Sequence, residues 1–201
     1  MTTDLYQART KAPDPGKPLV FVFHGTGGHE GQFFDLVQTL VPGAGVIAPR
    51  GDVSEHGALR FFKRTGEGVY DMDDLKARTA RMTDFIKAHL SATPNTPVFA
   101  FGYSNGANIL ASVMLESPEL FDRVGLLHPL IPWTPAPQPG LKGRKVFVSA
   151  GQHDPITPWS ASQALMDWLK AQGAEVTEAV HEGGHELREM EIRALQQFLS
   201  A

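Results

Sequence analysis

The chain has 201 residues, of which 42% are hydrophobic and 20% are charged, and its formal net charge is −4. These values are typical of a folded globular domain, and they exclude a disordered chain or a basic nucleic-acid-binding protein. The absence of cysteine excludes disulfides, thiolate metal ligands and a cysteine nucleophile. No apolar run approaches the roughly 20 residues that cross a bilayer, and no basic, apolar leader is visible. We therefore expect one cytoplasmic domain spanning residues 1–201, without stable membrane insertion.

Short apolar runs alternate with longer stretches whose apolar residues recur every three or four positions. In chain order, the expected strands are 19–23, 46–48, 98–101, 124–127, 146–149 and 175–180, with a further antiparallel edge strand near 5–10. The expected helices are 31–40, 71–90, 105–116, 160–172 and 186–200. Strands buried on both faces, with helices between them, are typical of a parallel sheet. We therefore predict an α/β fold with a mostly parallel sheet of about six or seven strands.

Two connections are longer than is usual in a compact domain: residues 50–70 and the proline-rich residues 128–144. Both follow the carboxyl ends of expected parallel strands, where α/β proteins place their sites. They are either plain surface connections or the walls of a site.

The segment Gly102-Tyr103-Ser104-Asn105-Gly106 matches the pattern G-x-S-x-G. It lies between an expected strand and an expected helix, the setting in which this pattern presents a nucleophilic serine on a sharp turn. The alternative is a serine that caps the helix between two flexible glycines. We interpret Ser104 as the nucleophile.

A serine hydroxyl needs a base, and the base needs an acid to orient it. In this fold the order along the chain is serine, acid, histidine. Asp154 follows an expected strand, and His185 lies in a glycine-rich loop before the last helix, so we expect them to be the acid and the base. His181 is the alternative candidate for the base. The alternative role for Asp154 is to form an Asx turn before Pro155. We expect no metal, because no metal-binding spacing relates His153, Asp154, His181 and His185.

The negative oxygen of an acyl-transfer transition state needs two backbone N–H donors. One comes from the residue after the nucleophile, Asn105, and the other from the loop after the first strand of the sheet. Thr26, within His24-Gly25-Thr26-Gly27-Gly28, is the candidate for that second donor. The alternative is that this segment is only a glycine turn.

Together these motifs resemble the phospholipase/carboxylesterase branch of the α/β-hydrolases, which includes acyl-protein thioesterases. The segments 60–64 and 67–71 are more similar to bacterial hydrolases linked to hydroquinone and catechol resistance. The resemblance covers nearly the whole chain and implies an α/β-hydrolase fold without a cap domain. It also implies a triad of Ser104, Asp154 and His185, with Thr26 and Asn105 as oxyanion donors.

The predicted function is that of a serine carboxylesterase that hydrolyses small short-acyl or aryl esters through an acyl-enzyme on Ser104, without a cofactor. Phe61 and Phe62 on one side and Trp133 on the other are the expected walls of the substrate site. Arg50, with its basic neighbours 60, 63 and 64, either binds a carboxylate of the substrate or forms a solvated basic face, which we favour. An acyl thioesterase or lysophospholipase, or a ligand-binding module on the same fold, are the alternatives. The expected partner is a small-molecule ester, with no nucleic acid, and a homodimer is left open.

Overall fold

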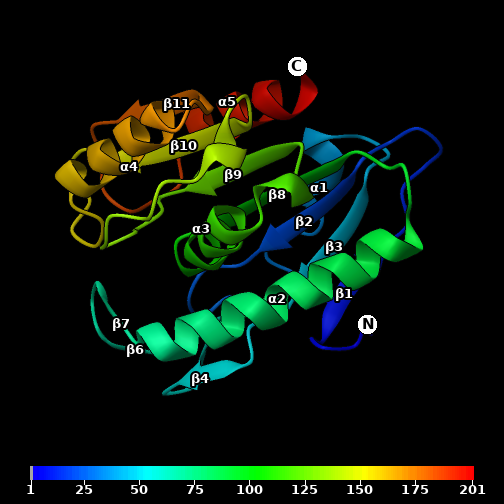
Figure 1. Ribbon diagram of the computed structural model, residues 1–201, viewed down its shortest axis with the longest axis horizontal. Coiled ribbons are helices and arrows are strands. Elements are labelled where there is room, and N and C mark those ends of the chain that lie inside the picture. Colours follow the sequence, from blue (N-terminus) through cyan, green and yellow to red (C-terminus); the bar gives the residue numbers. More distant parts are fainter. Residues whose placement is uncertain (1) are drawn as a thin grey trace.

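A twisted seven-stranded sheet runs through the middle of the computed structural model, which describes residues 2–201 (Figure 1). Its strands are β1 Ala8–Lys11, β2 Leu19–Phe23, β3 Gly45–Pro49, β8 Val98–Tyr103, β9 Arg123–Leu127, β10 Lys145–Gly151 and β11 Glu175–His181. Their order across the sheet is β1-β3-β2-β8-β9-β10-β11, and only the edge strand β1 pairs antiparallel. The predicted mostly parallel α/β sheet is confirmed, including the antiparallel edge strand.

Five α-helices cover the two faces of this sheet: α1 Leu36–Leu40, α2 Met72–Ala92, α3 Asn105–Glu116, α4 Trp159–Ala171 and α5 Glu189–Ser200. One core packs α2, α3 and α4 against the sheet, and the other packs α1 and α5 against its opposite face. The central strands read as continuous apolar runs because both of their faces are covered, and all five residues of β2 are buried.

Two helices are shorter than expected. The helix predicted over residues 31–40 forms only at Leu36–Leu40, and turns precede it, in which the Gln32 side chain accepts a hydrogen bond from the Gly25 N–H. The last helix begins at Glu189 rather than at 186, because Glu191 caps its first turn by accepting a hydrogen bond from the Arg188 N–H.

The expected loop at residues 50–70 contains two small hairpins. β4 Val53–Glu55 pairs with β5 Ala58–Arg60, and β6 Arg64–Gly66 pairs with β7 Val69–Tyr70. These strands have two or three residues each, which is too short for an alternating pattern to be visible in the sequence. Short 3-10 helices at Pro118–Leu120 and Pro139–Leu141 complete the elements.

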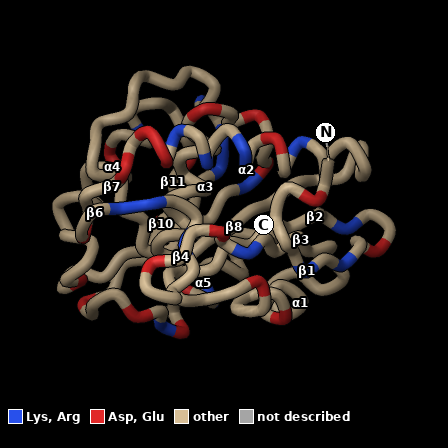
Figure 2. Tube along the Cα trace, turned by 90° about the horizontal axis from the view of Figure 1, so that it is seen from below, with Lys and Arg blue, Asp and Glu red and all other residues tan. Residues whose placement is uncertain are grey.

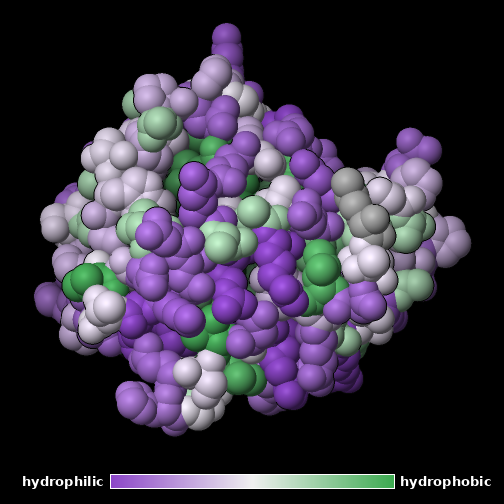
Figure 3. Space-filling model, turned by 60° about the horizontal axis from the view of Figure 1, so that its bottom comes forward, coloured by the Kyte–Doolittle hydropathy of each residue, from purple (hydrophilic) through white to green (hydrophobic). Residues whose placement is uncertain are grey.

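The surface of the molecule is mixed in charge and polarity. Figure 2 shows basic and acidic residues interspersed, with both signs along α2. On the face seen in Figure 3, hydrophobic residues form separate small patches among hydrophilic ones. No helix within residues 2–201 is both long enough and apolar enough to cross a membrane.

Candidate active site

Ser104 lies on a sharp turn where β8 ends and α3 begins. Its backbone is strained, with φ 52° and ψ −118°, a conformation that non-glycine residues rarely adopt. The flanking glycines make this turn possible. A Cβ on Gly106 would lie 2.3 Å from the Phe23 carbonyl oxygen, and one on Gly102 would lie 2.6 Å from the Gly106 backbone. Gly106 must therefore lack a side chain for the elbow to pack against β2, and Gly102 must lack one for the turn itself to close.

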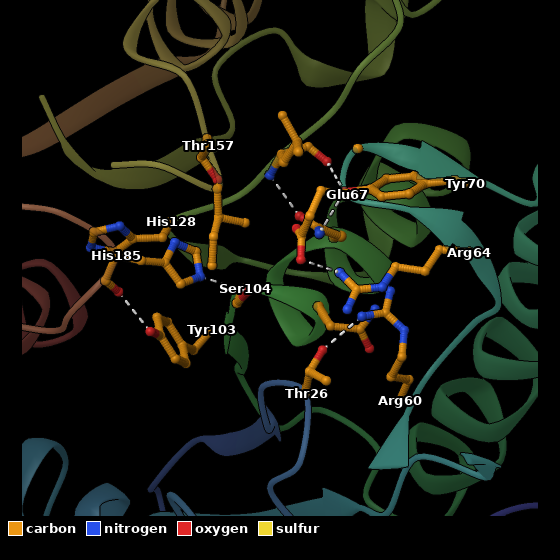
Figure 4. A pocket seen from close by; sticks show the side chains of 15 residues that line it. Thr26, Arg60, Arg64, Glu67, Tyr70, Tyr103, Ser104, His128, Thr157 and His185 are labelled. Atoms are coloured by element: carbon orange, nitrogen blue, oxygen red, sulfur yellow. Dashed lines mark hydrogen bonds and ion pairs between the residues drawn. The ribbon is translucent and has the colours of Figure 1, made fainter. Parts of the chain in front are cut away.

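The structure brings Ser104, His185 and Asp154 together in one hydrogen-bonded chain. His185 Nε2 lies 2.8 Å from Ser104 Oγ, and His185 Nδ1 lies 2.6 Å from Asp154 Oδ2. The three side chains come from the carboxyl ends of β8, β10 and β11 and meet at one edge of the sheet. Figure 4 shows His185 directed toward Ser104 in the pocket. Because a carboxylate only accepts hydrogen bonds, Nδ1 carries the proton and Nε2 is free to accept the serine proton.

Further hydrogen bonds hold these residues in place. Asp154 Oδ1 accepts from the N–H groups of Ile156 and Thr157 at 2.8 and 2.9 Å. The Tyr103 hydroxyl donates to the carbonyl of His185 at 2.6 Å, which ties the histidine loop to the elbow. His181, the rival base, lies farther back at the end of β11 and does not line the pocket around Ser104.

Sequence reasoning missed a second histidine at the site, His128, which is buried behind the triad. His128 Nδ1 lies 3.0 Å from the same Asp154 Oδ2, and its Nε2 lies 2.8 Å from Glu191 Oε1. These three side chains are at most 1% exposed. The His128 backbone is also in the left-handed region, at φ 50°. Its position directly after β9, between β8 and β10, is the signal that could have placed it at the site.

Opposing effects set the proton affinities within this cluster. Burial by itself lowers the pKa of His128, but its hydrogen bonds to Glu191 and Asp154 outweigh burial and raise the pKa. Burial raises the pKa of Asp154, yet hydrogen bonds from the Thr157 N–H and the two histidines bring that pKa below its ordinary value. The pKa of Glu191 is likewise raised by burial but lowered overall, chiefly by His128. His128 is thus favoured as an imidazolium between two carboxylates.

The sets His128–His181–Glu191 and His128–Asp154–His185 each bring three potential metal ligands together. Both ring nitrogens of His128 already face carboxylates, and those of His185 face Asp154 and Ser104. His153, considered for a zinc site in the sequence, instead contacts the carbonyl of Glu182 through Nδ1. These contacts describe a hydrogen-bond chain in which both ring nitrogens of His128 and of His185 already have partners.

Thr26 and Asn105 both line the pocket beside Ser104. Asn105 is the first residue of α3, so its N–H has no acceptor within the helix, and the Thr26 N–H donates no hydrogen bond within residues 2–201. Two consecutive residues, Arg60 and Phe61, form hydrogen bonds with the side chains of Thr26 and Asn105. The Phe61 N–H donates to Asn105 Oδ1, and Arg60 Nη1 donates to Thr26 Oγ1, each at 2.7 Å. Two backbone donors are therefore available next to the serine.

The pocket around Ser104 has a volume of about 260 Å³. Three residues that the sequence predicts to line this pocket lie outside it. Phe61 and Phe62 are fully buried in the core, because the hairpin chain folds inward there. Trp133 lines a separate cavity of about 500 Å³ against α4. Arg50 does not line the pocket either, since Glu30 holds its guanidinium at 2.6 Å.

Other residues form the wall opposite His185. Arg60, Arg64, Glu67 and Tyr70 line that side, with Leu130 and Ile156 as the apolar part of the lining. Figure 4 shows the two arginines and Glu67 directed toward one another across the pocket from the histidines. The prediction that Arg60 belongs to a solvated basic face is wrong, because this residue is only 2% exposed.

Comparisons with known proteins show the family of the chain. A model of the family described as serine aminopeptidase, S33, matches residues 14–145, which include the elbow. The putative hydrolase MhqD of Bacillus subtilis is 36% identical over 182 residues, 90% of this chain and 91% of the relative.

Two solved structures are similar over nearly the whole chain. A protein of unknown function from Agrobacterium tumefaciens is 50% identical, covers 100% of this chain and 98% of its own, and has a TM-score of 0.92. A Bacillus cereus carboxylesterase is 32% identical, covers 97% and 93%, and also has a TM-score of 0.92. The chain belongs to the hydrolase family described as serine aminopeptidase, S33, and to an esterase branch of the α/β-hydrolases.

Proposed function

We propose that this protein is a serine carboxylesterase that hydrolyses small short-acyl or aryl esters through an acyl-enzyme on Ser104. The observation that carries the proposal is the chain of hydrogen bonds from Ser104 through His185 to Asp154, at 2.8 and 2.6 Å, on the wall of a pocket. Such a chain activates a hydroxyl that is otherwise a poor nucleophile at neutral pH. The esterase branch of the family supports the same chemistry.

In the proposed reaction, Ser104 Oγ attacks the ester carbonyl carbon while His185 Nε2 takes the hydroxyl proton. The carbonyl oxygen becomes negative and accepts hydrogen bonds from the N–H groups of Thr26 and Asn105. When the tetrahedral intermediate collapses, His185 returns the proton to the leaving alcohol. A water molecule then repeats the cycle on the acyl-enzyme and releases the acid and free Ser104.

The size of the pocket supports small substrates. Its volume of about 260 Å³ is below the roughly 300–1,000 Å³ typical of pockets for drug-sized ligands. We therefore expect the rate with p-nitrophenyl esters to fall once the acyl chain exceeds about eight carbons. A steady rise in activity with longer chains would instead favour a thioesterase or lysophospholipase type of substrate.

Active-site labelling tests the nucleophile directly. The purified protein is treated with a fluorophosphonate, and its intact mass is measured beside that of Ser104→Ala. One adduct on the wild type and none on the variant is the expected result. A folded wild-type protein that forms no adduct would contradict the proposal and favour a ligand-binding module on this fold.

A further inference from the structure

Two arginines and a glutamate form the wall of the pocket that faces Ser104 from the side opposite His185 (Figure 4). We propose that Arg60 and Arg64 bind a carboxylate, and that the preferred substrates are short esters carrying a second, ionised carboxyl group. The proposal rests on the esterase function above and adds the chemical class of the substrate. We refer to Arg60, Arg64 and Glu67 as the anion wall.

Arg60 is a buried cation whose charge is only partly balanced. Its side chain is 3% exposed, and the nearest carboxylate, that of Glu55, lies 3.7 Å from Nε. Its Nε donates to the Phe62 carbonyl at 3.2 Å and its Nη1 to Thr26 Oγ1 at 2.7 Å, both neutral acceptors. Within residues 2–201, Nη2 donates no hydrogen bond. Because an unbalanced buried charge is costly, this site favours the arrival of an anion.

Arg64 presents a second donor in a fixed orientation. Its Nε and Nη2 form a fork with the carboxylate of Glu55, at 2.9 and 2.8 Å. This bidentate contact restrains the planar guanidinium. The remaining nitrogen, Nη1, lies 3.2 Å from Glu67 Oε1. Glu55 does not line the pocket around Ser104, whereas Arg64 and Glu67 do.

Glu67 occupies the position that we assign to the substrate carboxylate. It is 61% exposed and lies in the turn between β6 and β7, flanked by Gly66 and Gly68. Exposed pairs of this kind contribute little to stability, so a substrate can displace Glu67 at little cost. Its contact with Arg64 also shows that a carboxylate fits this donor. With Glu67 displaced, two cations face the bound acid.

The test compares two esters that differ in one group. Monoethyl succinate carries a carboxylate where ethyl levulinate carries a methyl ketone of nearly equal size. Hydrolysis is followed by titration of the released acid, and the readout is the ratio of the two kcat/KM values. We expect the kcat/KM of the wild type to be about tenfold higher for monoethyl succinate than for ethyl levulinate. A factor of this size is typical of one hydrogen bond to a charged group.

Two substitutions in the anion wall should move this ratio in opposite directions. Arg64→Gln should lower it by about tenfold, because the charged donor is lost. Glu67→Gln should raise it by about threefold, because the competing carboxylate is removed. Arg64→Lys keeps the charge but loses the fork, so its ratio should lie between those of the wild type and Arg64→Gln. If Arg64→Gln fails to fold, Arg64→Lys still tests the contribution of the Arg64 guanidinium.

A matched pair of variants controls for the change in net charge. Arg9 and Asp35 form an exposed pair at 3.5 Å that does not line the pocket. Arg9→Gln and Asp35→Asn should therefore leave the ratio unchanged. Turnover of ethyl levulinate with no preference for the monoester, or an equal ratio in wild type and Arg64→Gln, would overturn the substrate class alone. No turnover of either ester by folded protein would contradict the esterase function itself, and the substrate class with it.

Discussion

The residues around Ser104 are packed so closely that single atoms decide whether the elbow forms. Gly106 sits against the backbone of β2, where a Cβ would lie 2.3 and 2.4 Å from the carbonyl oxygens of Phe23 and His24. Backbone atoms of a central strand cannot move aside as the end of a flexible side chain can. The strain at Ser104 is therefore maintained by the packing of the elbow rather than by the serine itself.

Replacing Gly106 with alanine should lower the free energy of unfolding by about 3 kcal/mol, since the added carbon has no space. Urea denaturation of Gly106→Ala beside the wild type measures the loss. Gly66→Ala serves as the control, because a Cβ there would meet only the Val69 side chain at 4.0 Å. Equal stability of the two alanine variants would contradict this account of the elbow.

Asp154 accepts hydrogen bonds from two histidines with a single oxygen. In Asp154→Asn the negative charge is gone. The amide NH2 group cannot accept a hydrogen bond, so either the two histidines or the N–H groups of Ile156 and Thr157 lose their acceptor. We expect kcat to fall by roughly 10³–10⁴ for ester hydrolysis, with a much smaller change in KM. Steady-state kinetics with p-nitrophenyl acetate check this expectation. Asp167→Asn, on the exposed surface of α4, should retain wild-type rates.

At the scale of elements, the pocket is shared among parts of the chain that are distant in sequence. β7, α3 and the segment after β9 meet at the Tyr70 hydroxyl. This hydroxyl donates to the Leu130 carbonyl at 2.7 Å and accepts from Asn108 Nδ2 at 2.8 Å. Burial raises the pKa of Tyr70, so the hydroxyl stays protonated and able to donate. The β6–β7 hairpin, which carries Arg64 and Glu67 of the anion wall, is thereby fastened to the helix that begins at the elbow.

Tyr70→Phe leaves the Leu130 carbonyl and the Asn108 amide each without one partner. We expect the free energy of unfolding to fall by about 1–3 kcal/mol, the cost of buried polar groups that lose a hydrogen bond. Chemical denaturation gives the value. Tyr6→Phe is a matched control, because the buried Tyr6 hydroxyl makes no hydrogen bond within residues 2–201. A similar loss in both variants would show that the Tyr70 hydroxyl does not join these elements.

For the whole molecule, the cluster of Asp154, His128 and Glu191 links the sheet to α5 and makes stability depend on pH. The pKa values of the two carboxylates are lowered by folding, so their contribution is present above their unfolded values near 4 and is lost as the pH falls through the folded values. The pKa of His128 is raised, so its contribution is full below about 6.5 and is lost as the pH rises through its folded value. The cluster should stabilise the fold most between about pH 4 and pH 6.5.

Glu191→Gln tests this dependence while preserving the shape of the side chain. We expect the variant to be less stable than the wild type by about 2 kcal/mol near pH 5.5. The difference should be smaller near pH 9, because the stability that depends on the raised pKa of His128 is lost progressively above about pH 6.5. Urea denaturation at the two pH values provides the comparison. Glu189→Gln, which breaks an exposed pair with Arg193 on the same helix, is the control. A difference that is independent of pH would contradict an imidazolium at His128.

Much of the site could be predicted because its signals are local. The pattern from Gly102 to Gly106 joins a strand to a helix, and the order of strands along a parallel sheet brings the segments after β8, β10 and β11 to the same edge. The sequence therefore suffices to predict that Ser104, Asp154 and His185 lie near one another. The walls of the pocket were predicted less well. Residue type alone favours Phe61, Phe62, Trp133 and Arg50 as walls, but it does not reveal the direction in which a side chain points.

Patterns along the chain are enough to establish the alternation of buried strands and helices, and with it the α/β sheet and the edge where the site lies. Hydrophobic periodicity and glycine positions are properties of neighbouring residues, so they can be read along the chain. The folded arrangement is needed to see that His128 and Glu191 extend the chain of hydrogen bonds, and that Arg60 and Arg64 face Ser104. Such contacts join residues as much as 63 positions apart, and they depend on packing between layers and on where charge is buried.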